Sequence, residues 1–268
     1  RLLGGWKSLL IVSDFDRTIT TAACGTSCHG VVESCAELSD DYKEATKKLA
    51  AHYYPIEISA TLTREEKIPL MQQWYHQAHT HLLTQPLTPA LLESAAQQSN
   101  AALRPGFEEL FSLCHAHGTP LIVCSAGLGN VVRALLKHLL PEAERLRVAA
   151  LPIVSNWLKF DTRDVVCGFS QPLLHMFNKD GEWIKDHVQG FEQLAANCSV
   201  ALLLGDGLGD AAMGDGLGIP HVLKIGFLNE SEPSRVNARL PAYRQAFDIV
   251  LLGDQSFEWL NALLRHLQ

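Results

Sequence analysis

The arrangement of apolar positions along the chain predicts a parallel α/β protein. Three short runs rich in Leu, Ile and Val are each followed by Ser or Gly and then by a helical pattern. Continuous runs of this length are typical of strands that helices bury on both faces. The three runs are Ser8–Val12, Pro120–Cys124 and Val200–Leu204, and two weaker ones are Val222–Ile225 and Ile249–Leu252.

Helical patterns follow these runs and have clear ends. One predicted helix ends at Gly118 and another ends at Pro141, two residue types that terminate helices. An amphipathic segment closes the chain. These three predicted helices are Gly106–His117, Leu128–Leu140 and Phe257–Leu267.

A long segment, residues 21–104, separates the first two predicted strands and has almost no strand pattern. Within it, Thr63 and Glu66 have the spacing of a capping box at a helix start. An insert of this size between neighbouring core strands indicates a domain. We therefore expect a catalytic core of residues 1–20 and 105–268, with residues 21–104 forming a helical cap that selects the substrate. The predicted cap helices are Leu38–Tyr53, Arg64–Leu83 and Pro89–Gln97.

Composition and charge narrow the range of partners. The chain has 268 residues, of which 47% are hydrophobic and 19% charged, and no apolar run approaches the ~20 residues of a membrane-spanning helix. The N-terminus does not resemble a secretory signal. The net charge is −7 and there is no stripe of basic residues, so the chain lacks the positive surface that binds a nucleic-acid backbone. We expect a monomer that contacts neither membrane nor nucleic acid.

The cysteines indicate a reducing compartment. There are seven, an odd number, and Cys114 and Cys124 lie within apolar segments, where a reduced thiol behaves as a small hydrophobic group. Disulfides are rare in the cytosol, where thiols stay reduced. We therefore expect a cytoplasmic protein.

Acidic residues follow two of the predicted strands. Asp14 and Asp16 come after the first strand, and Asp206 and Asp210 come after the third. Parallel sheets bind their ligands at the carboxyl ends of the strands. A polar turn would explain the first pair alone, but two acidic strand ends in one sheet would repel each other without a cation between them. Hard oxygen ligands favour Mg²⁺, which also accepts a phosphate oxygen.

The second strand leads into Ser125-Ala126-Gly127, which opens a helix. A hydroxyl group and free N–H groups at a helix N-terminus can bind a phosphate, although serine is equally common there as a structural cap. A cation is still needed to offset the phosphoryl charge. Lys179 follows an apolar stretch and precedes a turn, but spacing alone does not distinguish it from Lys159. The lysines between the second and third strands are Lys137, Lys159, Lys179 and Lys185.

The ordered set of DFDRT, SAG, a downstream lysine and GDGLGD resembles the haloacid-dehalogenase superfamily of phosphohydrolases. More narrowly, the chain resembles the cytosolic pyrimidine 5′-nucleotidases of type III, from about residue 8 to the end. This narrower resemblance is specific because it includes segments that differ from the general superfamily. Those segments are Tyr53–Glu57, Leu62–Lys67, Trp74-Tyr75, Phe177–Lys179 and Leu223–Gly226.

The resemblance implies a Rossmann-like core and a magnesium-dependent phosphatase that hydrolyses pyrimidine nucleoside 5′-monophosphates through an aspartyl-phosphate. It makes Asp14 the nucleophile and a magnesium ligand. Asp16 becomes the acid that protonates the leaving oxygen and then the base that activates water, with its carbonyl on the metal. Asp206 ligates magnesium, and Asp210 holds the metal site.

The same resemblance implies how the substrate is held. Ser125, Ala126 and Gly127 bind the phosphate, and Lys179 neutralises the nucleophile and the phosphoryl oxygens. In the cap, Glu57 matches the glutamate that reads the base. A carboxylate suits the exocyclic amino group of cytosine, because that group donates hydrogen bonds.

Other functions remain open at this point. A phosphatase of the phosphoserine type would need a cap arginine to grip a carboxylate, for which Arg64 and Arg104 are candidates. A nucleoside phosphotransferase would use an alcohol in place of water. The Cys24–His29 segment could form a small metal site, although its spacing is loose. A non-catalytic relative would have damaged motifs, and none of the four is damaged.

Overall fold

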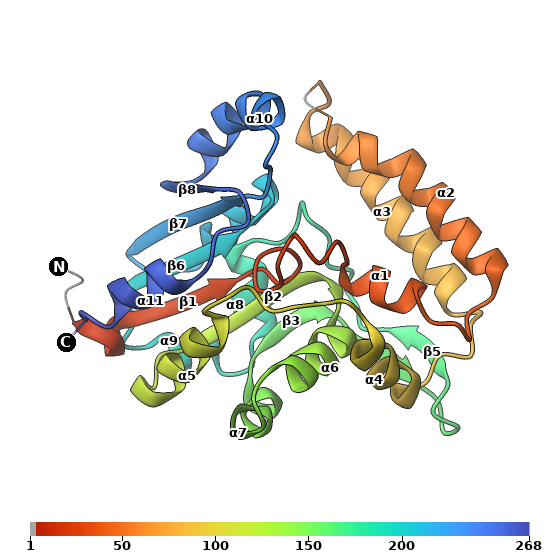
Figure 1. Ribbon diagram of the computed structural model, residues 1–268, viewed down its shortest axis with the longest axis horizontal. Coiled ribbons are helices and arrows are strands. Elements are labelled where there is room, and N and C mark those ends of the chain that lie inside the picture. The colour runs from red at the N-terminus through yellow and green to blue at the C-terminus, as the bar shows by residue number, and fades with distance from the viewer. Residues whose placement is uncertain (1–3, 60, 268) are drawn as a thin grey trace.

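The computed structural model describes residues 4–59 and 61–267 and contains a six-stranded sheet covered by helices (Figure 1). The strand order is β3-β2-β1-β6-β7-β8, and every neighbouring pair is parallel. The predicted α/β class is therefore confirmed. The strands are β1 (Leu9–Ser13), β2 (Leu121–Leu128), β3 (Ile153–Asn156), β6 (Val200–Gly205), β7 (His221–Leu228) and β8 (Ile249–Leu252).

Side chains along each central strand alternate between two hydrophobic clusters, one on each face of the sheet. In β1, Leu9 and Ile11 enter one cluster, whereas Leu10 and Val12 enter the other. This explains the continuous apolar runs, because both faces are covered. The first face is covered by α1 (Cys28–Glu33), α4 (Pro89–Gln98), α5 (Phe107–His117), α6 (Gly129–Leu139) and α11 (Glu258–Leu264). The second is covered by α8 (Gly181–His187), α9 (Phe191–Ala195), the 3-10 helix η3 (Leu208–Gly214) and α10 (Pro233–Ala246).

Several short elements were not predicted from the sequence. β3 and an antiparallel pair, β4 (Leu158–Phe160) and β5 (Val166–Phe169), are too short to give a clear period. Helix α10 was missed because most of its side chains are polar or exposed, and within it only Tyr243 is buried. None of the helices in the described residues is both long enough and apolar enough to cross a membrane.

The insert between β1 and β2 is helical, as predicted. Its two long helices, α2 (Asp40–Glu57) and α3 (Arg64–Leu82), pack side by side and stand beyond the sheet in Figure 1. The expected capping box is present, since Thr63 and Glu66 exchange hydrogen bonds. Helix α2 continues to Glu57, past its predicted end at Tyr53, although Pro55, a residue that usually interrupts helices, lies inside it.

The other two helices of the insert, α1 and α4, pack with the core. Four residues of these helices belong to the hydrophobic cluster on the first face of the sheet, the one that contains Leu9 and Ile11 of β1. They are Val31 and Val32 of α1 and Leu92 and Ala96 of α4. The α2–α3 pair is thus the part of the insert that stands apart. The division into core and cap at residues 20 and 104 stays a prediction.

Candidate active site

Three carboxylates meet at the ends of β1 and β6. Oxygen atoms of Asp14, Asp206 and Asp210 all lie within 4.8 Å of one another. The backbone N–H of Asp14 donates to the carbonyl of Leu204 at 2.9 Å, so strand pairing sets the register of the two acidic ends. The structure therefore brings together the two acidic clusters of the sequence.

Lys179 lies among these carboxylates. The residue is 2% exposed, and its Nζ donates to Asp14 and, at 2.7 Å, to Asp210. Burial alone would lower the pKa of Lys179, but Asp14 and Asp210 outweigh it and the pKa is raised. Lys159, in contrast, is exposed on β4. The structure thus distinguishes the two lysines that spacing left equivalent.

The charge balance of this cluster fits a divalent cation. Burial raises the pKa of Asp14, and Asp210 adds to the rise while Lys179 opposes it. Burial, together with Asp14 and Asp210, also raises the pKa of Asp206. Three carboxylates against one ammonium group leave excess negative charge, and a set of oxygen donors is what Mg²⁺ prefers. Asp14 and Asp206 are thus suited to hold that ion.

Asp210 also holds the turn after β6. Its Oδ2 accepts hydrogen bonds from the backbone N–H groups of Asp206 (3.0 Å) and Gly207 (2.8 Å). A side chain on Gly205 would place its Cβ 2.3 Å from the Cβ of Asp210, so only glycine fits there. Asp210 therefore positions the turn that carries Asp206, and its expected role in holding a metal site stays a prediction.

Asp16 is oriented by the start of α1 and is not part of the three-carboxylate group. Its Oδ1 accepts a hydrogen bond from the backbone N–H of Cys28 at 2.9 Å, and burial raises its pKa. A Cβ on Gly127 would lie 3.3 Å from its Oδ2, so the carboxyl group is next to the SAG turn. The Cys28 contact could not be predicted from the sequence, since every residue type except proline can supply a free N–H in the first turn of a helix.

The SAG segment lies within β2, which continues to Leu128 and so extends past the strand end predicted at Cys124. The register of β2 against β3 shifts between Cys124 and Leu128, so backbone hydrogen bonding there is irregular. Ser125 is buried, and its Oγ accepts the N–H of Gly127 at 3.1 Å. Leu128, which precedes α6, offers no capping side chain, so the first N–H groups of that helix can bind an anion.

Glu57 lies in the last turn of α2 and is half-buried. Burial raises its pKa to about 7, although Arg17 and Lys67 act in the opposite direction. Tyr75 of α3 was given no role from the sequence. Burial and then the charge of Glu57 raise the pKa of Tyr75, Lys179 lowers it, and Asp16 and Asp14 raise it. Tyr75 therefore lies within electrostatic reach of both Glu57 and the acidic cluster.

Neither arginine considered for a substrate carboxylate is free. Arg64 donates to the carbonyl of Phe177 at 2.5 Å, which links α3 to the segment before Lys179. Arg104 is fully buried and bonded to backbone carbonyls. Within residues 4–59 and 61–267, the side chains of the Cys24–His29 segment form no group suited to a metal ion.

Relatives of known activity match almost the whole chain. A family model described as pyrimidine 5′-nucleotidase (UMPH-1) matches residues 15–268. The 7-methylguanosine phosphate-specific 5′-nucleotidase of Gallus gallus is 35% identical over 268 residues, covering 98% of this chain and 89% of the relative. The Homo sapiens protein of the same name is 32% identical over 269 residues, covering 98% of this chain and 86% of the relative.

Solved structures agree with this. Cytosolic 5′-nucleotidase IIIB bound to cytidine has a TM-score of 0.85 and 32% identity, covering 98% of this chain and 87% of that chain. A phosphoserine phosphatase, solved as a phospho-aspartyl intermediate analogue, shares the fold with a TM-score of 0.55 at 18% identity, covering 97% of this chain and 98% of that chain. The resemblance found in the motifs is confirmed: the protein is an enzyme of the 5′-nucleotidase class and belongs to the pyrimidine 5′-nucleotidase (UMPH-1) family.

Proposed function

We propose that this enzyme requires Mg²⁺ and hydrolyses a nucleoside 5′-monophosphate to nucleoside and phosphate through an aspartyl-phosphate on Asp14. One observation carries the proposal: the buried Lys179 contacts Asp14 and Asp210 where Asp206 joins the same cluster. A buried group of three carboxylates and one ammonium is expensive to maintain without a function, because each ion loses its hydration. Perturbed ionisable groups of this kind concentrate at catalytic sites.

The reaction has two steps, formation and hydrolysis of the aspartyl-phosphate, and Asp14, Asp16 and Lys179 each have a role in them. The ionised Asp14 attacks phosphorus, forming an O–P bond while the bond to the ribose 5′-oxygen breaks, and Asp16 gives that oxygen a proton. Asp16 then takes a proton from the water that attacks phosphorus and releases Asp14. The raised pKa of Asp16 favours the protonated form that the first step needs. Lys179 favours the ionised form of Asp14, because its charge lowers the pKa that burial raises, and it offsets phosphoryl charge.

Three further groups complete the site. The Ser125–Gly127 turn and the start of α6 bind the phosphate oxygens. Magnesium, when bound by Asp14 and Asp206, with the carbonyl of Asp16 and support from Asp210, supplies positive charge for the transferring phosphoryl group. The protein provides the orientation of these ligands.

Glu57 indicates which bases fit. The relatives are named for 7-methylguanosine phosphate, and the related solved structure contains cytidine. Cytosine and guanine bases both carry an exocyclic amino group that donates hydrogen bonds. An ionised Glu57 accepts such a bond, so we infer a preference for these bases over uracil, which lacks the donor. The expected pyrimidine substrate is then cytidine 5′-monophosphate.

A phosphate-release screen tests the proposal. The substrates are the 5′-monophosphates of cytidine, uridine, guanosine and 7-methylguanosine, together with phosphoserine, each with Mg²⁺ and with EDTA. We expect Mg²⁺-dependent release from the cytidine or 7-methylguanosine compound and little from phosphoserine. Release that is equal with EDTA would contradict the metal requirement. Added nucleoside as acceptor distinguishes hydrolysis from phosphotransfer.

We also propose the cytosol as the compartment. A Caenorhabditis elegans relative, 32% identical over 264 residues, is named putative cytosolic 5′-nucleotidase 3. All seven cysteines are free in the structure, which suits a reducing environment. The partner we expect is the small nucleotide alone, with the enzyme acting as a monomer and without nucleic acid or membrane, which size-exclusion chromatography and binding assays can check.

A further inference from the structure

A fully buried arginine lies behind the active site. Arg104, in the connection between α4 and α5, is 0% exposed, and its guanidinium carbon lies 4.2 Å from the centre of the Phe227 ring. A buried guanidinium needs partners for its five N–H groups. Arg104 donates to the carbonyls of Thr18 (2.7 Å), Gln255 (2.6 Å) and Arg17 (2.5 Å), to Oδ1 of Asn229 (3.1 Å) and to Oδ1 of Asp254 (2.8 Å).

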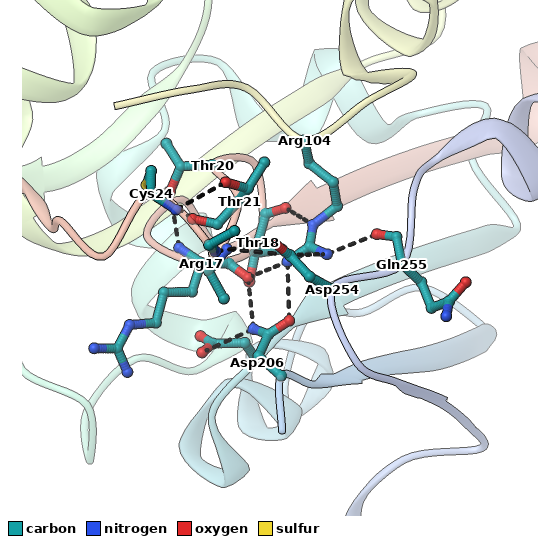
Figure 2. A network of polar contacts seen from close by, with 12 residues as sticks. Arg17, Thr18, Thr20, Thr21, Cys24, Arg104, Asp206, Asp254 and Gln255 are labelled. Atoms are coloured by element: carbon teal, nitrogen blue, oxygen red, sulfur yellow. Dashed lines mark hydrogen bonds and ion pairs between the residues drawn. The ribbon is translucent and has the colours of Figure 1, made fainter. Parts of the chain in front are cut away.

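Two of these acceptors lie directly after the catalytic Asp16, and Figure 2 shows Arg104 reaching them. Arg17 has a φ of 61°, a left-handed conformation that is unfavourable for a residue with a Cβ. Three backbone contacts hold it there, from Arg104, from Asn229 (2.8 Å) and to Oγ1 of Thr20 (2.9 Å). The loop after β1 is therefore fixed from behind.

Asn229, the first residue after β7, connects this loop to a proposed magnesium ligand. Its Oδ1 accepts from Arg104, so its Nδ2 is directed to the carbonyl of Arg17 at 2.8 Å and to Oδ2 of Asp206 at 3.5 Å. The side-chain amide of Asn229 has one acceptor atom, Oδ1, and two N–H donors on Nδ2. Because the cationic Arg104 donates to Oδ1, the Nδ2 end faces the carboxylate of Asp206. The orientation of the Asn229 side chain is thus determined at both ends.

The backbone of Asp206 is held separately. The hydroxyl of Tyr243 donates to the carbonyl of Asp206 at 2.5 Å. Loss of Asn229 would therefore leave the main chain of Asp206 in place and free its carboxylate to rotate. An Asn229 variant should therefore change the orientation of the Asp206 carboxylate without changing the fold around it.

We propose that Asn229 is a positioning residue, anchored by Arg104, that orients the carboxylate of Asp206 toward Asp14 for magnesium binding. The inference rests on the proposed function, since it requires that Asp14 and Asp206 hold the ion. Groups that hydrogen-bond a metal ligand typically contribute ~10–100-fold to metal affinity. Asn229 acts through Asp206 and does not need to touch the substrate.

Calorimetric titration of Mg²⁺ into the substrate-free enzyme tests the proposal. We expect Asn229→Ala to weaken binding by ~10-fold. Asn229→Gln keeps the amide but lengthens its stem, so it cannot maintain all three contacts and should weaken binding as well. Asn237→Ala, at an exposed position of α10, is the matched control and should bind like the wild type. In turnover assays, the Mg²⁺ concentration for half-maximal activity should rise in both Asn229 variants, while kcat at saturating Mg²⁺ changes little.

Affinities within about two-fold of the wild type in both Asn229 variants would overturn the proposal, because a positioning contact must affect the ion. If Asn229→Ala also lowers the melting temperature, the Mg²⁺ affinity of Asn229→Gln is the result by which the proposal is judged. Absence of Mg²⁺ binding in the wild type would instead refute the metal site of the proposed function, and this inference with it. Binding in the wild type with unchanged Asn229 variants would refute only the role of Asn229.

Discussion

Replacing Lys179 by methionine probes the charge balance on which the site depends. Methionine has a similar volume and no charge, so packing changes little while the ammonium group is lost. Asp14, Asp206 and Asp210 then share a buried site without any counter-charge from Lys179. The variant should be less stable without metal and should recover stability when Mg²⁺ is added.

The expected size follows from the geometry. At an effective dielectric constant of about 20, the pair of Lys179 and Asp210 at 2.7 Å attracts by ~6 kcal/mol, most of which offsets the lost hydration of two ions. Removing one partner of such a buried pair costs ~3–5 kcal/mol. Without Lys179, which lowers the pKa values of Asp14 and Asp206, these two values rise further. An acid with a raised pKa binds more protons in the folded state, so the deficit should shrink below about pH 7, the raised pKa of Asp14 in the wild type, and grow as the pH rises above it.

Urea unfolding in EDTA and in Mg²⁺, with phosphate release measured in parallel, tests this reasoning. Lys159→Met, on the exposed face of β4, is the matched control and should keep wild-type stability and activity. The Lys179 variant should lose ~10²–10³-fold in kcat, the usual effect of removing one group that stabilises transition-state charge. Unchanged stability in EDTA would show that the carboxylates are not charged together in the folded protein and would refute the argument.

Three further predictions concern the proposed roles. Asp14→Asn should lower turnover by ~10⁴-fold or more while keeping the circular dichroism spectrum, and retained hydrolysis would exclude Asp14 as nucleophile. Because the pKa of Glu57 is raised to about 7, the ionised form, which accepts the stronger hydrogen bond, predominates above that pH, so the KM for cytidine 5′-monophosphate should fall as the pH rises through 7. Glu57→Gln should flatten that profile and reduce base selectivity, and an unchanged profile would exclude this role. Removal of divalent ions by EDTA should abolish activity, and Mg²⁺ should restore it.

The sequence predicted the parts of the fold that repeat a strong local pattern. Strands buried on both faces gave continuous apolar runs, as in β1 and β6, and helix ends such as Gly118 had distinctive residues. Short elements such as β3–β5 have too few residues to show a period, and α10 is too polar to show an apolar face. The helix end predicted at Tyr53 was too early, because α2 continues through Pro55 to Glu57 although proline usually interrupts a helix.

The candidate site was predictable where chemistry requires a particular residue type. The acidic strand ends follow from the need to hold a cation, and the topology then brings them together. Contacts made by backbone groups, or by side chains far away in the sequence, could not be predicted from a local sequence pattern. The N–H of Cys28 on Asp16, and the contacts of Arg104 and Asn229 behind the loop, depend on tertiary packing. The choice of Lys179 over Lys159 likewise needed the structure, because only burial distinguishes them.

Rapid quenching with a nucleotide labelled at its 5′-phosphate tests the central claim most directly. The claim is that Asp14 becomes phosphorylated in a site completed by Asp206 and Mg²⁺. The wild type should carry an acid-stable, hydroxylamine-sensitive label on Asp14 that requires Mg²⁺, and Asp14→Asn should carry none. Rapid turnover without any such label, or a label that persists in Asp14→Asn, would contradict the account.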